Sequence, residues 1–180
     1  DGGSAFLEKA MQVEKSDRFI SFTEMLQAFE QLGFRTLSSE NAEYELRGLL
    51  GRGGQAAVYQ ARRSTDGQDV AIKRVSARNQ SDRFRREARI LGENPHEHIV
   101  DYIDFLEIKE WGGDEYCLIL ELLEGMPGAT LRNRIRNSDG GLPVEEVVVA
   151  FRHFLSALDH LHNNHCIHRD IKPGNLYLQP

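Results

Sequence analysis

Apolar residues recur at helical spacing in the first part of the chain and predict two short helices. Two runs, over residues 5–13 and 22–32, each place their apolar side chains on one face. A capping box precedes the second run, and a glycine follows it at the position of a typical helix stop. We therefore expect a helical hairpin within residues 1–37, followed by a polar connector over residues 38–43.

Beyond the connector the apolar period changes from helical to strand-like, and turn residues separate the runs. Tight turns join the first three runs, so these predict an antiparallel meander. A helix with an apolar stripe interrupts the strands over residues 82–91. The five predicted strands cover residues 44–50, 56–62, 69–75, 99–108 and 116–120.

A break rich in Gly and Pro, over residues 125–128, separates this sheet from a helical segment. A short helix is expected near Leu131, and Pro143 is placed to open a long helix. The apolar stripe of the long helix consists of Val147, Phe151, Phe154, Leu155, Leu158 and Leu161. The whole pattern predicts an α+β fold, with a five-stranded antiparallel sheet and one helix followed by a helical part.

Composition narrows the class of protein. With 40% hydrophobic and 28% charged residues, the 180-residue chain has the make-up of a globular protein, and a formal charge of −6 argues against nucleic-acid binding. Cys117 and Cys166 lie in apolar runs, so we expect free thiols in a reducing compartment and a cytoplasmic location. No apolar run approaches the roughly 18 residues of a membrane-spanning helix.

Residues 51–58 read Gly-Arg-Gly-Gly-Gln-Ala-Ala-Val and fit a G-x-G-x-x-G-x-V loop with Ala56 at the third glycine. Glycine lets backbone N–H groups approach phosphate oxygens, but the same residues suit any tight hairpin, so the loop alone is a weak signal. A dinucleotide-binding loop would lead directly into a helix. Because a strand follows here, a Rossmann-type site is disfavoured.

A lysine and a glutamate are candidates for an inward ion pair. Lys73 ends the apolar strand run Val-Ala-Ile-Lys, where the hairpin would place a cation beneath the glycine turn. Glu87 lies three residues after Phe84 and four before Leu91, so its carboxylate shares the inward face of the helix. An unpaired inward carboxylate is costly, which favours pairing with Lys73. The alternative is that Glu87 rims the stripe and pairs with a nearby arginine.

The most specific pattern begins at His168, where H-R-D-I-K-P-G-N matches the protein-kinase catalytic loop H-R-D-x-K-x-x-N at every specified position. Phosphoryl transfer asks a protein mainly for positioning and charge neutralisation. Asp170 suits the orientation of a hydroxyl nucleophile, and Lys172 suits the charge of the transferred phosphoryl group. Asn175 offers a neutral oxygen ligand for Mg²⁺.

Four histidines bunch around the end of the long helix, at His160, His162, His165 and His168. A zinc site is disfavoured, because no cysteine or carboxylate completes a tetrahedral set on a consistent face. We expect core or surface imidazoles instead, with His168 packed as a structural support.

From about Tyr44 onward, the order of glycine loop, strand lysine, helix glutamate, hinge and catalytic loop resembles the eukaryotic-like Ser/Thr protein kinase family. The resemblance implies a small lobe over residues 44–123 and the beginning of a helical large lobe over residues 124–180. It also implies ATP between the lobes, Mg²⁺, and a protein Ser or Thr hydroxyl as acceptor. The glycine-loop and catalytic-loop endings, A-x-V-Y and K-P-G-N, are reminiscent of bacterial members.

The resemblance also assigns roles to single residues. Leu120 takes the place of the gatekeeper before the hinge, and Tyr177 stands beneath adenine, where the family usually has a smaller aliphatic residue. Asn175 becomes a metal ligand. The implied catalytic residues are Asp170, Lys172, Lys73 and Glu87. The implied nucleotide site is lined by Leu50, Gly51, Gly53, Val58, Ala71, Lys73, Leu120, Glu121, Leu123 and Tyr177.

The sequence departs from the family pattern at both ends. The family's D-F-G aspartate would follow Leu178, and the given sequence stops at Pro180, so we expect these residues alone to transfer little phosphate and to leave the apolar stripe of the long helix exposed. Residues 1–37 resemble the last helices of a kinase domain, with Arg18 at the family's arginine. Two interpretations stay open, a slice of a tandem-kinase polypeptide or a helical extension packed on the small lobe.

Three functions are compatible with these features. The first is a protein Ser/Thr kinase, and the second is a pseudokinase or ATP-binding regulatory module. The third is a small-molecule kinase of related fold. Lys172 two residues after Asp170 belongs to the protein-kinase pattern and argues against the third.

Overall fold

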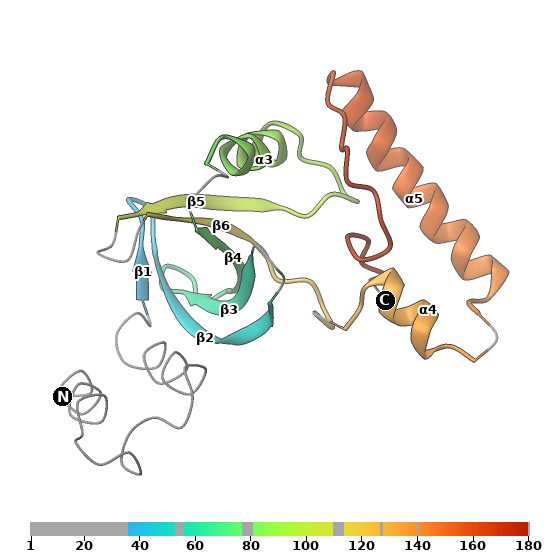
Figure 1. Cartoon of the computed structure of the whole chain (residues 1–180), viewed down its shortest axis with the longest axis horizontal. Helices are drawn as coiled ribbons and strands as arrows, with labels where there is room; N and C mark the ends of the chain where they lie inside the picture. Colours follow the sequence, from blue (N-terminus) through green and yellow to red (C-terminus); the bar gives the residue numbers. More distant parts are fainter. Residues whose placement is uncertain are drawn as a thin grey trace, which may run out of the picture.

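The computed structural model describes residues 36–52, 56–76, 81–109, 114–126, 128–139 and 141–179. The helical hairpin expected within residues 1–37 therefore lies almost entirely outside the described residues. A six-stranded antiparallel sheet is followed by two helices and an extended segment (Figure 1). Among the described residues, no helix is long and apolar enough to cross a membrane.

The sheet has the strand order β1-β2-β3-β4-β6-β5. The strands are β1 (Thr36–Ser38), β2 (Glu43–Arg52), β3 (Ala57–Arg63), β4 (Asp69–Ser76), β5 (Tyr102–Ile108) and β6 (Glu115–Glu121). Five of them match the predicted strands to within a few residues. The sixth, β1, was not predicted, because a three-residue strand with one buried side chain, Leu37, leaves no periodic signal.

The turn between β1 and β2 is built by a serine within the expected connector. The Ser39 hydroxyl oxygen accepts hydrogen bonds from the backbone N–H groups of Asn41 and Ala42, both at 3.1 Å. Such side-chain-to-backbone bonds stabilise a tight reversal. The reversal pairs Leu37 with Tyr44 across the two strands.

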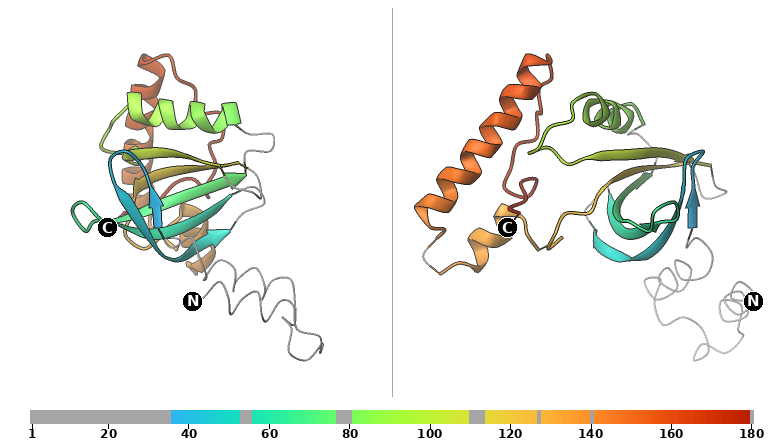
Figure 2. Two further views of the ribbon diagram at one scale, coloured as in Figure 1. Left: turned by 90° about the vertical axis from the view of Figure 1, so that its left-hand side faces the viewer. Right: turned by 180° about the vertical axis from the view of Figure 1, so that it is seen from behind.

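The sheet is strongly curved, so that strands at its two ends face each other across a shared core (Figures 1 and 2). The hydroxyl of Tyr44 on β2 donates a 3.0 Å hydrogen bond to Asp104 on β5, although three strands separate them in the sheet. The buried residues inside the curve are Leu37, Ala42, Tyr44, Ala61, Val70, Ile72, Leu106, Cys117 and Ile119.

Helix α3 (Ser81–Glu93) packs against β5 and β6 on the other face of the sheet. Its Phe84 and Ala88, which are 3% and 6% exposed, form a second core with apolar residues of β4 and β6. Side chains alternate along β4 between these two cores. Val70 and Ile72 point into the curve of the sheet, whereas Lys73 and Val75 point to the face that α3 covers.

The helical part begins with α4 (Leu131–Asn137), whose N-cap Thr130 accepts a 3.2 Å hydrogen bond from the N–H of Asn133. Pro143 precedes α5 (Val144–Asn163), as predicted. The extended segment after α5 returns to α4, where Thr130 forms an antiparallel bridge with Tyr177.

Helix α5 buries only part of its apolar stripe. Leu161 is 7% exposed, but Phe151 and Leu155 are 57% and 50% exposed. The middle of the stripe is therefore exposed, as expected. The C-terminal end of α5, which leads into the catalytic-loop sequence, is packed.

Candidate active site

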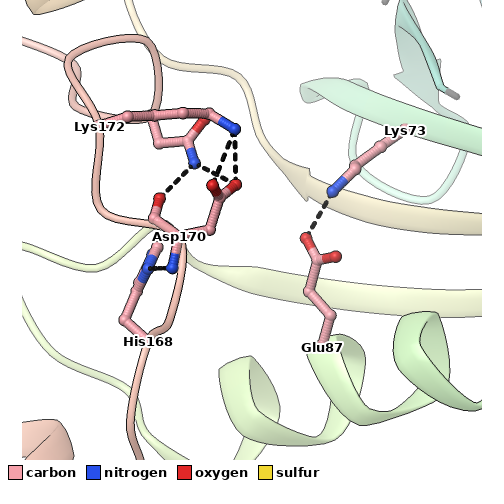
Figure 3. A network of polar contacts seen from close by, with 6 residues as sticks. Lys73, Glu87, His168, Asp170 and Lys172 are labelled. Carbon is pink, nitrogen blue, oxygen red and sulfur yellow. Dashed lines mark hydrogen bonds and ion pairs between the residues drawn. The ribbon is translucent and has the colours of Figure 1, made fainter. Parts of the chain in front are cut away.

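Strand β4 and helix α3 bring together the predicted lysine and glutamate. The Nζ atom of Lys73 lies 2.6 Å from Oε1 of Glu87, in an ion pair whose side chains are 30% and 38% exposed (Figure 3). The same Nζ lies 5.3 Å from the centroid of the Phe84 ring, within the range of a cation–π contact. The predicted pairing of Lys73 with Glu87 is confirmed.

Local sequence explains why the two charges meet. Lys73 follows three buried residues of β4 and lies opposite Val58 on β3 and Leu118 on β6. Glu87 lies one turn after the buried Phe84, so the packing of α3 turns it toward the sheet. The cation is held at the α3 side of the sheet by this pair.

The loop after α5 gathers two polar side chains around the carboxylate of Asp170. Lys172 Nζ lies 2.7 Å and 2.9 Å from the two carboxylate oxygens of Asp170. Asn175 Nδ2 donates both to the backbone carbonyl of Asp170, at 2.8 Å, and to its Oδ2, at 2.9 Å (Figure 3). The three residues with predicted roles in this loop therefore form one hydrogen-bonded cluster.

Two backbone features fix the turn that carries Asp170. Arg169 has a φ of 63°, in the left-handed region that is uncommon for residues other than glycine. The N–H of Asp170 donates a 3.2 Å hydrogen bond to Nδ1 of His168. His168 was expected to be packed, but its side chain is exposed, and its contact with the loop is this hydrogen bond.

The cluster keeps Asp170 in its ionised form. Hydrogen bonds from Lys172, and secondarily from Asn175, hold the pKa of the Asp170 carboxyl below its usual range, and the positive charge of Arg83 adds a smaller contribution. Arg83 lies on α3, one turn before Glu87, so the helix that holds Lys73 also places a cation near the catalytic-loop carboxylate. No motif in the sequence pointed to this relation between Arg83 and Asp170.

The strand register brings part of the predicted nucleotide site together. Ala71 on β4 lies opposite Leu120 on β6, and Gly51 on β2 lies opposite Val58 on β3. Leu50 precedes Gly51 in β2 and is half-buried. Gly53, also predicted to line this site, lies outside the described residues.

The predicted nucleotide-site residues Glu121 and Leu123, which follow Leu120, and Tyr177, predicted beneath adenine, also lie among the described residues. The N–H of Glu121 donates to the carbonyl of Asp101 at 3.0 Å, so this donor is already used within the protein. Leu123 is half-buried, and its carbonyl accepts a 3.2 Å bond from the N–H of Met126. Tyr177 is half-buried, and burial raises the pKa of its hydroxyl.

Two open grooves lie away from these residues. One, of about 420 Å³, runs between α3 and β5, and the other, of about 440 Å³, lies along the apolar stripe of α5. Neither is lined by a predicted site residue, so neither is interpreted as the nucleotide site.

A strand lysine paired with a helix glutamate, together with a loop that stabilises an ionised aspartate, is typical of the nucleotide lobe and catalytic loop of a protein kinase. Comparison with known families agrees, since the protein kinase domain matches residues 44–180. The chain belongs to the protein kinase family.

Relatives come from plants, animals and bacteria. The chain is 33% identical over 140 residues to the serine/threonine-protein kinase TIO of Arabidopsis thaliana, covering 76% of this chain and 10% of the relative. It is 36% identical over 141 residues to PksC of Streptomyces coelicolor, covering 75% of this chain and 25% of the relative. It is 34% identical over 143 residues to PrkC of Bacillus subtilis, covering 77% of this chain and 21% of the relative. The chain thus spans a quarter or less of the length of these serine/threonine-protein kinases.

Proposed function

We propose that this chain supplies the nucleotide-binding lobe and catalytic loop of an enzyme that transfers the γ-phosphoryl group of ATP to Ser or Thr hydroxyls of proteins. The observation that carries the proposal is the 2.6 Å ion pair between Lys73 and Glu87 on the same chain as the Asp170 cluster. The names of the relatives, all serine/threonine-protein kinases, support the choice of acceptor.

Each group suits one part of the reaction. Lys73 supplies a positive charge for ATP phosphates, and Glu87 holds its ammonium in place. Ionised Asp170 orients the acceptor hydroxyl and accepts its proton as the oxygen attacks the γ-phosphorus, while the bond from this phosphorus to the bridging oxygen breaks and ADP leaves. Lys172, already within 2.9 Å of Asp170, compensates negative charge on the transferred group.

Mg²⁺ is part of the same proposal, and the chemistry of the loop fits it. Because Nδ2 of Asn175 is engaged by Asp170, Oδ1 is the atom that Asn175 can offer to a metal ion. A neutral amide oxygen beside a carboxylate is a typical ligand set for a hard divalent cation. When bound, Mg²⁺ supplies charge neutralisation for the phosphate oxygens.

ATP as phosphoryl donor and a protein as acceptor are the proposed partners, and a cytoplasmic location is proposed with them. Cys117 and Cys166 form no disulfide among the described residues, which is compatible with a reducing compartment.

The direct test uses the full-length protein that contains this chain, with γ-labelled ATP, Mg²⁺ and a Ser/Thr-containing acceptor such as casein. Wild type is expected to transfer label to Ser and Thr, and Asp170→Asn is expected to lose about 10²- to 10⁴-fold in kcat. The matched control is Asp159→Asn, on the exposed side of α5. ATP binding without any transfer by wild type would contradict the proposal and favour a regulatory nucleotide-binding module.

A further inference from the structure

Two backbone hydrogen bonds join the start of α4 to the loop that carries Asp170. The N–H of Leu131 donates to the carbonyl of Leu176 at 2.8 Å, and the N–H of Arg132 donates to the carbonyl of Pro173 at 3.0 Å. The extended segment after α5 returns to α4 at this point (Figure 1). The backbone of Arg132 is therefore fixed against the catalytic loop.

The side chain of Arg132 lies in the space that Gly174 leaves by having no side chain. A Cβ atom added at Gly174 would lie 3.0 Å from a terminal nitrogen of the Arg132 guanidinium and 3.1 Å from its Cζ atom. Glycine permits a charged group to approach the backbone this closely. A larger residue at this position would displace the guanidinium from the loop.

Gly174 also connects the guanidinium to the catalytic carboxylate. It directly precedes Asn175, whose side-chain amide donates to Oδ2 of Asp170 at 2.9 Å. The backbone N–H of Asn175 donates to the carbonyl of Lys172 at 2.9 Å, which closes the loop into a turn. The path of contacts from Arg132 to the Asp170 carboxylate therefore runs through Gly174 and Asn175.

Arg132 carries a charge that the protein itself does not compensate. The residue is exposed and takes part in no ion pair among the described residues. By contrast, Lys172 is paired within the catalytic loop, and Arg134 on α4 pairs with Glu146. Glu124, which precedes α4, is exposed, so solvent and salt screen its opposing charge. The guanidinium of Arg132 is thus open to an external anion.

We propose that Arg132 is a specificity-determining residue that selects acceptor proteins with an acidic side chain a few positions from the phosphorylated Ser or Thr. This inference rests on the proposed function, because it names the acceptor class of that same site. An extended acceptor chain advances about 3.3–3.6 Å per residue, so side chains close to the reacting hydroxyl pass the loop surface beside Gly174. A carboxylate at this point pairs with the planar guanidinium, which can bind both carboxylate oxygens, whereas a basic side chain is repelled.

A series of peptide acceptors tests this role with the full-length protein. Each peptide contains a single Ser, and Glu, Gln or Lys is placed in turn at each of the four positions before and after it. Transfer from γ-labelled ATP gives kcat/KM for every peptide at low ionic strength. For wild type, Glu should exceed Gln about two- to fivefold at one or more positions, the size expected of an exposed charge pair. Addition of about 0.5 M KCl should bring this ratio toward one, since salt screens exposed charges.

Three substitutions of Arg132 and one control decide whether this side chain is the cause. Arg132→Gln should bring the ratio of Glu to Gln close to one, and Arg132→Lys should retain part of the preference. Arg132→Glu should favour Lys over Gln at the same position. The control, Arg152→Gln, removes an exposed arginine beside the apolar groove of α5 and should keep the wild-type ratio. Each ratio compares peptides on one protein, so a general change in activity cancels.

The outcomes separate this inference from the proposed function. Absence of transfer to every Ser-containing acceptor would contradict the proposed function and selection by Arg132 together. Equal transfer to Glu and Gln peptides by an active wild type would overturn selection by Arg132 and leave the proposed function standing. A preference for Glu that persists in Arg132→Gln would do the same.

Discussion

Tyr44 on β2 and Asp104 on β5, which three strands separate in the curved sheet, are joined by a single 3.0 Å hydrogen bond. Tyr44 is 1% exposed and Asp104 is 9% exposed, and the second carboxylate oxygen of Asp104 accepts the N–H of Phe105 at 2.8 Å. The carboxylate is thus satisfied from both sides within the core. This bond links β2 to β5 across the inside of the curve, and we expect it to stabilise the sheet that presents Lys73 to α3.

Tyr44→Phe should lower the free energy of unfolding by about 1–3 kcal/mol, because it leaves one oxygen of a buried carboxylate without its donor. Urea unfolding gives the measurement. Tyr102→Phe is the matched control, since Tyr102 is 36% exposed and should change stability by less than about 0.5 kcal/mol. Equal effects of the two substitutions would show that the bond does not stabilise the sheet.

Alkaline pH should weaken the same region. Burial, assisted by the hydrogen bond to Asp104, raises the pKa of Tyr44 to about 12. A pKa raised on folding stabilises the protein fully below the ordinary tyrosine value near 10, and this stabilisation is lost as pH rises from about 10 to about 12. Absorbance titration of phenolate should show a step near pH 12 that disappears in Tyr44→Phe. Titration of every tyrosine near pH 10 would contradict the assignment.

Two ion pairs of the sheet should differ in their effect on stability. Arg74 pairs with Glu115, and the arginine side chain is only 17% exposed. Glu115→Gln should therefore cost about 1–3 kcal/mol, because it leaves a largely buried guanidinium without its charged partner. Glu107→Gln breaks the exposed pair with Arg85 and should cost less than about 1 kcal/mol. Thermal or urea unfolding measures both, and the reverse ranking would refute this reasoning.

The ionisation of Asp170 should depend on its lysine neighbour. Lys172→Met should raise the pKa of the Asp170 carboxyl toward its ordinary value, whereas Lys172→Arg should keep it low. A lowered pKa stabilises the loop above the ordinary aspartate value, and this contribution is lost as pH falls through the lowered pKa. Carboxyl carbon shifts measured by NMR, assigned with Asp170→Asn, report the change. An unchanged titration in Lys172→Met would show that Lys172 does not hold this charge.

Sequence patterns predicted the helices and strands that have a clear apolar period, and the catalytic loop, which matches a specific motif. The pairing of Lys73 with Glu87 followed from the position of Glu87 beside Phe84 on one helix face, because a helical period fixes which side chains share a face. Lys172 and Asn175 contact Asp170 within a few positions along the chain, so the catalytic-loop motif could predict that these residues act together.

Other features depend on relations that no local pattern carries. Strand β1 is too short to show a period, and the bond from Tyr44 to Asp104 exists because the sheet curves through strands far apart in sequence. His96 and His98 meet α5 only through tertiary packing, so their contacts with His160 and His153 could not be predicted from spacing along the chain.

We propose that the Lys73–Glu87 pair prepares this site for phosphoryl transfer, and steady-state transfer from γ-labelled ATP by the full-length protein tests this role. Lys73→Met should lower kcat/KM about 10²-fold or more and Glu87→Gln about tenfold, since a positioned charge is lost in the first case and its anchor in the second. The exposed controls Lys109→Met and Glu93→Gln should match wild type. Full activity in Lys73→Met, or equal losses in the controls, would contradict the account.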